Sequence, residues 1–392
     1  MSTQKVTDSL IEAVSSSVLS GTLPVLDASA VTGILGFVNT TNASDPAIDT
    51  NPTTGVGTIW TNSTSGEVFC CTDATADANV WTNIGAGSGD IQPWEEGASI
   101  NIYKIGGHND SNGASNHIER INVSSGTNSV DVADMEHAGG SMSCHSDAGH
   151  NYGYYAGGNQ GTRSNQIEKF QYSAESNAAE VGTLVISGRS HEGSESSTHG
   201  YVGSGGSPRT QIITKFAFAS PSTDSSVGNL NNPRNSSGAG QSSSTHGYSC
   251  GGYDGATHGQ VINKYSHSSD GDAVAAGNLT YYGYGMKGAS SETYGYTAGG
   301  YQTGSPPSYT YFNIIDRFAF ASDAGASDWG DLGYSPDSPG GANSTTHGFT
   351  FGGHAGGSFS NTINKWSMVS QSPTADIGNL DSGRYSPGGL NY

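Results

Sequence analysis

Short runs of alternating apolar and polar residues, separated by turns rich in glycine and serine, occupy most of this 392-residue chain. Alternation at every second residue is typical of β-strands with one buried face. One run, with the pattern Ile-x-Lys/Arg-aromatic, occurs six times, and only the first copy lacks the aromatic residue. The copies lie at residues 118–121, 167–170, 213–216, 262–265, 315–318 and 363–366.

Two further patterns keep a constant order around these copies. A unit that begins with Gly-Tyr/Phe and ends in Gly-Gly precedes them, as at residues 153–158, and a Gly-Asn-Leu unit follows, as at residues 228–230. Successive copies are separated by 49, 46, 49, 53 and 48 residues. A period of about 40 to 50 residues, built from short strands and turns, is the sequence signature of a β-propeller. The chain is therefore predicted to be all-β, with a propeller of six four-stranded blades.

This order of strands resembles the kelch repeat over roughly residues 100–392, and the Gly-Gly and aromatic elements match best. The tryptophan usual in kelch repeats is mostly replaced here by the Gly-Asn-Leu unit, so the resemblance is to a divergent, kelch-like family. It implies that the stretch before each Gly-Tyr unit, such as residues 236–243, forms the innermost strand of a blade. Glycine and serine suit such a crowded axis.

The first repeat lacks an inner strand, whereas the chain ends with an extra inner-strand phrase at residues 386–390 that matches residues 338–341. We therefore expect the C-terminal residues, through Tyr392, to supply the inner strand of the first blade. Closure of this kind leaves no exposed sheet edge. The basic residue of the repeated unit is expected to act as scaffold, with its head group on an acidic or carbonyl partner.

The N-terminal quarter of the chain has a different pattern. Val6, Leu10 and Val14 recur at helical spacing, which predicts a short amphipathic helix within residues 5–19. We expect residues 1–45 to form an attachment and oligomerisation segment, residues 46–95 a small β-module, and residues 96–392 the propeller.

Two N-terminal stretches resemble phage proteins. Residues 23–34 resemble the Leu-Pro-x-Leu-Asp-x-Ser-x-Leu-Thr segments of bacteriophage tail-fibre proteins, and residues 55–85 resemble a β-module of phage virion structural proteins. In that module, Trp60 and Trp81 are expected to form the core of a small sheet, with sugar binding as the alternative.

Composition and charge narrow the classes of partner. A formal net charge of −20, with only 14 Lys and Arg residues, argues against nucleic-acid and anionic-membrane binding. No apolar run approaches the length of a membrane span, and no secretory signal is apparent. Four cysteines do not make a disulfide framework, so free thiols are expected.

The candidate chemistry is binding and not catalysis. His199, His246 and His347 occupy equivalent places in different repeats, too far apart to share a metal ion, so no metal, cofactor or catalytic residue is expected. The longest period contains a proline-stiffened, tyrosine-rich loop at residues 301–312. Exposed tyrosines offer flat faces to sugars or to a protein partner, and a neutral loop insertion is the alternative. The candidate ligand-binding residues are Tyr301, Tyr309, Tyr311 and Tyr282.

These features together predict a phage virion appendage that carries a propeller for attachment to the host surface, without enzymatic activity. Its expected partners are other virion proteins, through the N-terminal segment, and a glycan or protein of the host. A homo-oligomer is expected, with three chains the natural number for a fibre. A purely architectural virion protein is the alternative, and a carbohydrate-active or oxidative propeller enzyme is a third hypothesis.

Overall fold

A computed structural model describes residues 39–84, 101–109, 113–147, 151–159, 161–205, 209–234, 239–303, 309–355 and 357–391. These residues form 32 β-strands and no helix, which confirms the all-β class. The helix expected within residues 5–19 lies outside the described residues. Contacts divide the chain into two compact units, Met1–Glu95 and Glu96–Tyr392.

The first unit contains one four-stranded sheet in the order β1-β2-β3-β4. Its strands are β1 (Asn39–Asn42), β2 (Ile59–Asn62), β3 (Val68–Asp73) and β4 (Val80–Asn83). β1 pairs in parallel with β2, so the sheet begins before the boundary expected at residue 46. The rings of Trp60 and Trp81 meet edge to face at 5.9 Å, and their indole N–H groups donate to the carbonyl oxygens of Ser44 and Thr50. This geometry favours a core role for both tryptophans.

The second unit contains six sets of four antiparallel strands, numbered here as repeats 1 to 6. Repeat 1 comprises β32 (Gly388–Asn391), β5 (Asn101–Ile105), β6 (His117–Asn122) and β7 (Val130–Asp134). Repeat 2 comprises β8 (Ser143–Ser146), β9 (Tyr152–Ala156), β10 (Ser164–Gln171) and β11 (Ala179–Gly188). Repeat 3 comprises β12 (Glu192–Glu195), β13 (His199–Gly205), β14 (Thr210–Ala217) and β15 (Ser220–Arg234).

Repeats 4 to 6 follow the same plan. Repeat 4 comprises β16 (Ala239–Ser242), β17 (His246–Cys250), β18 (Val261–Ser266) and β19 (Val274–Asn278). Repeat 5 comprises β20 (Lys287–Ser290), β21 (Tyr294–Ala298), β24 (Ile314–Ala319) and β25 (Ser327–Asp331). Repeat 6 comprises β26 (Gly340–Asn343), β27 (His347–Phe351), β30 (Thr362–Ser367) and β31 (Ala375–Asn379). Two hairpins, β22 (Tyr301–Thr303) with β23 (Tyr309–Tyr311) and β28 (His354–Ala355) with β29 (Ser358–Phe359), complete the unit.

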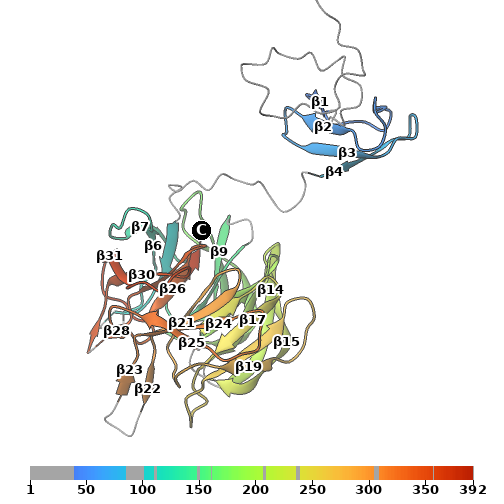
Figure 1. Ribbon diagram of the computed structural model, residues 1–392. Helices are drawn as coiled ribbons and strands as arrows, with labels where there is room; N and C mark the ends of the chain where they lie inside the picture. The colour runs from blue at the N-terminus through green and yellow to red at the C-terminus, as the bar shows by residue number, and fades with distance from the viewer. Residues whose placement is uncertain are drawn as a thin grey trace, which may run out of the picture. The chain divides into compact units, whose positions relative to one another are not determined.

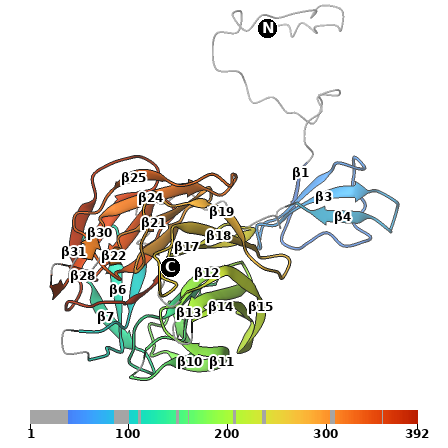
Figure 2. The same cartoon turned by 90° about the horizontal axis from the view of Figure 1, so that it is seen from below.

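Repeats 2 and 3 are joined into one eight-stranded sheet by a single parallel pair, Thr183 with Thr223, between β11 and β15. The edge strands of that sheet, β8 and β12, pack against each other, so the sheet is a nearly closed, barrel-like structure (Figure 2).

The first strands of all six repeats pack in the cyclic order β8, β12, β16, β20, β26 and β32, and β32 in turn packs on β8. The repeats follow one another around the C-terminal end of the chain (Figure 2). β32 pairs with β5, from Gly388 opposite Ile105 to Asn391 opposite Ile102. The expected pairing of the C-terminal strand with the first repeat is thereby confirmed.

Glycine occupies the second position of five of these first strands, and the cavity that they enclose holds only about 80 Å³. At the fourth position, a backbone N–H donates to a side-chain oxygen of the neighbouring repeat. These links run from Glu195 N to Ser242 Oγ (2.8 Å), Ser242 N to Ser290 Oγ (3.0 Å), Ser290 N to Asn343 Oδ1 (3.2 Å), Asn343 N to Asn391 Oδ1 (2.7 Å) and Asn391 N to Ser146 Oγ (3.2 Å).

The basic residue of the repeated unit binds the next repeat in four of six cases. The contacts are Arg120 with Glu175 (2.8 Å), Lys215 with Asp270 (2.6 Å), Lys264 with Asp323 (2.9 Å) and Lys365 with the carbonyl oxygen of Val123 (3.3 Å). Lys169 and Arg317 instead lie 3.6 Å from the ring centres of Tyr152 and Trp329, respectively. These contacts support the scaffold role expected for the basic residue.

The variable residue of the unit is buried in every repeat. At that position Glu119, Glu168 and Asp316 each accept a hydrogen bond from the backbone N–H of the second residue after the fourth strand of the preceding repeat. Glu119 also binds Lys104 at 2.6 Å, and both side chains are fully buried. Burial lowers the pKa of Lys104, although the Glu119 carboxylate opposes this shift. Five of the six pairs of neighbouring repeats, all but repeats 2 and 3, are thus joined through these polar groups as well as through apolar packing.

Candidate functional site

In five repeats the second strand is followed directly by a glycine pair, and in three of them the aromatic or histidine residue after the pair bridges to the segment just before the repeat's own first strand. Gly300 has a φ of +91°, and a Cβ at this position would lie 2.8 Å from the carbonyl oxygen of Tyr284. Only glycine therefore allows Tyr301 to pair with Tyr284, as the isolated bridge between them requires. Equivalent bridges join His108 to Tyr385 and His354 to Asp337.

The β22–β23 hairpin brings together three of the four tyrosines predicted from the sequence (Figure 1). Tyr301 lies opposite Tyr311 in the register, and their rings stack at 5.9 Å. The ring of Tyr309 lies 6.3 Å from Tyr301 and 6.4 Å from Tyr311, and 57% of this residue is exposed. The hairpin thus presents a cluster of tyrosine rings to solvent.

This cluster is the middle of a longer row of rings. On one side, the ring centre of Tyr284 lies 4.1 Å from that of Tyr301. The Tyr284 ring also stacks with the rings of Tyr253 and His258, with ring centres 5.4 and 5.2 Å apart. On the other side, the row runs from Tyr311 to His354 (6.1 Å), Phe359 (5.5 Å), Tyr385 (5.4 Å) and His108 (5.5 Å). We call this row, which spans repeats 4, 5, 6 and 1, the aromatic rim.

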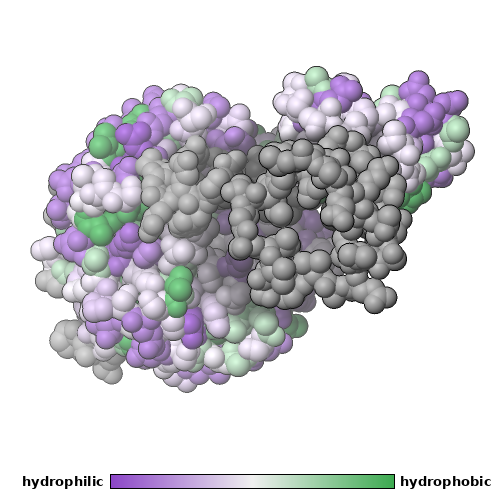
Figure 3. All heavy atoms as spheres, turned by 45° about the horizontal axis from the view of Figure 1, so that its top comes forward, coloured by the Kyte–Doolittle hydropathy of each residue, from purple (hydrophilic) through white to green (hydrophobic). Residues whose placement is uncertain are grey.

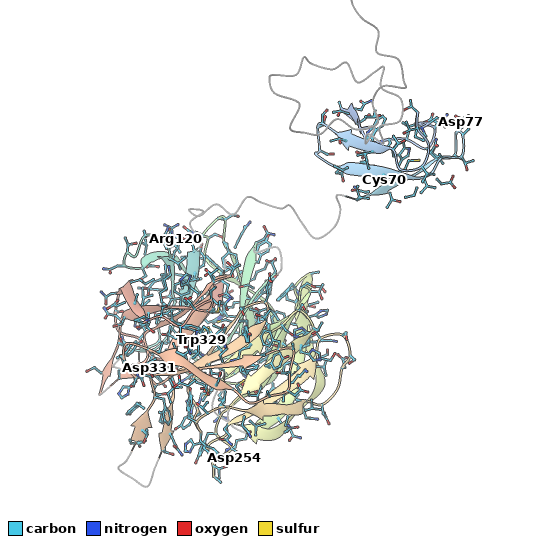
Figure 4. All side chains as sticks on the ribbon, viewed as in Figure 1. Cys70, Asp77, Arg120, Asp254, Trp329 and Asp331 are labelled. Atoms are coloured by element: carbon cyan, nitrogen blue, oxygen red, sulfur yellow. The ribbon has the colours of Figure 1, made fainter. Side chains whose placement is uncertain are left out.

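Tyr282 lies at a pocket beside one end of the aromatic rim. The pocket has a volume of about 210 Å³, and it is lined by Tyr282, His258, Asp254, Thr257, Gln260 and Asn278 with neighbouring backbone. Tyr282 is 49% exposed, and the shared lining residue His258 connects it to the rim. Figure 4 places Asp254 at the end of the sheets from which the β22–β23 hairpin projects. All four tyrosines predicted from the sequence therefore belong to one region.

The rim carries little charge at neutral pH. Burial raises the pKa of Tyr284, Tyr301 and Tyr311, so their hydroxyl groups remain protonated. Burial lowers the pKa of His258, although the charge of Asp254 opposes this shift. Such a surface can stack and form hydrogen bonds.

One carboxyl group lies under the rim. Burial raises the pKa of Asp337 to about 7, although a hydrogen bond from Ser338 Oγ at 2.7 Å favours the carboxylate. The charge of Asp337 in turn contributes to the raised pKa values of Tyr284, Tyr301 and Tyr311.

Replacing Asp337 with Asn should make the protein more stable at alkaline pH. A carboxyl group whose folded pKa exceeds its unfolded value costs stability as the pH rises from about 4 to above 7. After allowance for partial exposure, we expect D337N to gain about 1 to 3 kcal/mol at pH 8 and nothing at pH 4. Urea unfolding across this range measures the difference. D328N, which removes an exposed carboxylate of β25, is the control, and an equal gain at both pH values would contradict the assignment.

The recurrent histidines do not assemble a site. His199, His246 and His347 lie on β13, β17 and β27, and each Nδ1 is 2.8 to 2.9 Å from the hydroxyl of the preceding threonine. Within the described ranges, one group of three side chains has the proximity that a metal requires, namely His117, Glu119 and Asp381. Because Lys104 already binds Glu119, and His117 already binds Asp381 at 2.9 Å, we interpret this group as a network of ion pairs.

Neither the groove beside Trp329 nor the hydrophobic residues of the described surface indicate a second site. Trp329 and Asp331 (Figure 4) line a groove of about 650 Å³. The guanidinium of Arg317 covers one face of the indole ring of Trp329. On the face shown in Figure 3, hydrophobic residues are interspersed with hydrophilic ones. The cysteines of the described residues are free, as expected. None of the described segments forms a helix with the length and hydropathy needed to cross a membrane.

Sequence reasoning missed most of the rim. It singled out the tyrosines of the long loop, but not the residues that follow or face the glycine pairs, such as Tyr253, His354 and Tyr385. A signal was present, since an aromatic or histidine residue directly follows the Gly-Gly pair in four repeats. Comparison with known protein families gives no family that matches this chain, and comparison with curated proteins gives no match.

Proposed function

We propose that this protein is a bacteriophage virion appendage whose second unit is a six-bladed, kelch-like β-propeller that attaches to the host surface. The aromatic rim is the observation that carries the attachment function. Rows of partly exposed rings are rare on monomeric surfaces without a binding role, and tyrosine gives a large contact area at small entropic cost.

Three features support the propeller. Each repeat has four antiparallel strands, the six first strands pack in cyclic order, and the last strand of the chain pairs with the first repeat. β11 and β15, which join repeats 2 and 3, are the fourth strands of their repeats, and one residue pair between them is in β-register. This pair leaves the order of strands within each repeat unchanged.

The placement on a virion rests on the resemblance of residues 23–34 and 55–85 to phage tail-fibre and virion proteins. Under this proposal, the N-terminal segment binds other virion proteins and assembles the chains, with three as the number natural to a fibre, and the propeller faces the host. Residues 1–38, which include the proposed anchor, lie outside the described residues.

Replacing Tyr301, Tyr309 and Tyr311 together with alanine should abolish adsorption to host cells. We expect labelled full-length protein to bind candidate host cells saturably, and the triple variant to bind at least about ten-fold more weakly. Since the hairpin projects from the sheets, the variant should keep the wild-type circular dichroism spectrum. Y294A, at the opposite end of β21 from the rim, is the matched control.

Two outcomes would count against this function. Full retention of adsorption by a folded triple variant would place adhesion elsewhere on the chain. Absence of binding by the folded wild-type protein, across the candidate hosts, would favour a purely architectural role in the tail, baseplate or head.

A further inference from the structure

We propose that the pocket beside Tyr282 binds one pyranose ring of a neutral polysaccharide, and that the aromatic rim carries the continuing sugar chain. This inference deepens the proposed attachment function and rests on it for its biological setting. Its chemistry comes from the lining of the pocket, from the row of rings and from the charge of the chain.

The pocket combines a flat ring with free polar groups. Tyr282 is half exposed, and the described residues provide no hydrogen-bond partner for its hydroxyl or for the side-chain amides of Gln260 and Asn278. A sugar ring has an apolar C–H face and hydroxyl groups around its edge, so it can stack on a phenol ring while amides bind its hydroxyls. A volume of about 210 Å³ fits one such ring but not a folded peptide segment.

The rest of the lining is held in place before any ligand binds. Asp254 Oδ1 accepts hydrogen bonds from the backbone N–H groups of Ala256 and Thr257, and Asp254 Oδ2 accepts one from Thr257 Oγ. On the other side, the Nε2 atom of His258 lies 3.0 Å from Thr303 Oγ of β22. A lining that is already ordered loses little entropy when a ligand enters.

The row of rings leads away from this pocket without interruption. From His258, successive ring centres are 5.2 Å to Tyr284, 4.1 Å to Tyr301 and 5.9 Å to Tyr311. None of these four residues is fully buried. His258 stacks on Tyr284 at 17° and Tyr301 stacks on Tyr311 at 28°, so these rings cover part of one another's faces. A ligand that enters the pocket with one unit can therefore place its following units along the exposed edges of the row.

Charge selects among the polymers that can bind in this way. Single-stranded nucleic acid also stacks on aromatic rows, but it needs a basic groove, and this chain has a net charge of −20. The same net charge disfavours sulfated, phosphorylated and uronic-acid polymers. Neutral glycans remain the class that matches both the stacking surface and the charge.

The test is affinity electrophoresis of the full chain through native gels that contain one polysaccharide each. The probes are a neutral α-glucan, β-glucan, galactan and mannan, with dextran sulfate as the anionic comparison. We expect at least one neutral polymer, but not dextran sulfate, to retard the protein. Y282A should weaken that binding at least about ten-fold, Y282F should bind nearly as the wild type, and Q260A should weaken binding less than Y282A. Y294A should bind as the wild type.

Three results would overturn the inference. They are the absence of retardation by all four neutral polymers, unchanged binding by folded Y282A, and stronger retardation by dextran sulfate than by any neutral polymer. Its failure differs from failure of the attachment function. Cell adsorption without binding to any neutral polymer would reject the glycan site and keep attachment. Glycan binding without adsorption to any candidate host would keep the glycan site and count against the attachment function.

Discussion

A chain that ends at Pro387 is expected to unfold at least about 10 °C below the full-length protein, because it lacks β32. Leu390 is 1% exposed, and it packs in the same core cluster as Tyr103 and Phe170. Loss of a buried leucine costs about 2 to 5 kcal/mol by itself. The deletion also removes the pairing with β5 and the link from Asn343 to Asn391, and it exposes β5 as a sheet edge.

Differential scanning calorimetry measures this loss, and a peptide of residues 388–392, which the truncated chain lacks, supplies its control. Added in excess to the truncated chain, the peptide should bind beside β5 and restore part of the lost melting temperature. The same peptide with G389A should not, since a Cβ at Gly389 would lie 2.1 Å from the carbonyl oxygen of Gly341. An unchanged melting temperature after truncation would show that ring closure does not stabilise the fold.

Replacing Gly240 with alanine is expected to cause the second large loss of stability. Gly240 lies on β16, one of the six first strands around the axis. A Cβ at Gly240 would lie 2.0 Å from the carbonyl oxygen of Gly193, and one at Gly288 would lie 2.0 Å from that of Gly240. Backbone atoms cannot yield as a flexible side chain can, so neighbouring first strands would have to separate. Overpacking costs about 1 to 3 kcal/mol in ordinary cores. We expect about 3 kcal/mol or more here, because the closed ring limits relaxation.

Urea unfolding of G240A beside G271A tests this explanation. A Cβ at Gly271 would meet no atom within 4 Å, so G271A makes the same chemical change without a clash. We expect G271A to differ from the wild type by no more than about 0.5 kcal/mol. Equal stability of the two variants would contradict the close approach of the first strands at the axis.

Much of the repeat architecture could be predicted because residues close together in the sequence define each strand and turn. The Ile-x-Lys/Arg unit marks the third strand of every repeat, and the extra phrase at the C-terminus predicted the partner of β5. The partners of the basic residues were less predictable. Lys169 lies over Tyr152, a ring on the neighbouring strand of its own repeat, and not against a carboxylate of the next repeat. The pairing of β11 with β15 had no sequence signal, since it rests on one residue pair.

The candidate site was predictable where it lies in one loop and not where it crosses repeats. Tyr301, Tyr309 and Tyr311 are close in sequence, so their clustering in a hairpin followed from a single loop. Tyr385 and His108 are far apart in sequence, and they meet only because the C-terminal strand closes on the first repeat. Tyr282 was chosen as a neighbour of the loop. The structure adds its pocket, whose other lining residues come from repeat 4 and the segment that follows it.

The position of β5 has a mechanical consequence. The chain enters the second unit at β5, which is not an edge strand, because β32 and β6 flank it on both sides. Tension applied through the preceding residues would therefore pull β5 lengthwise between two antiparallel neighbours. Its hydrogen bonds to both would bear the force together, instead of opening one at a time as at a free edge. Because β32 flanks β5, force on the residues before β5 loads its hydrogen bonds in shear and does not peel the strand from a free edge.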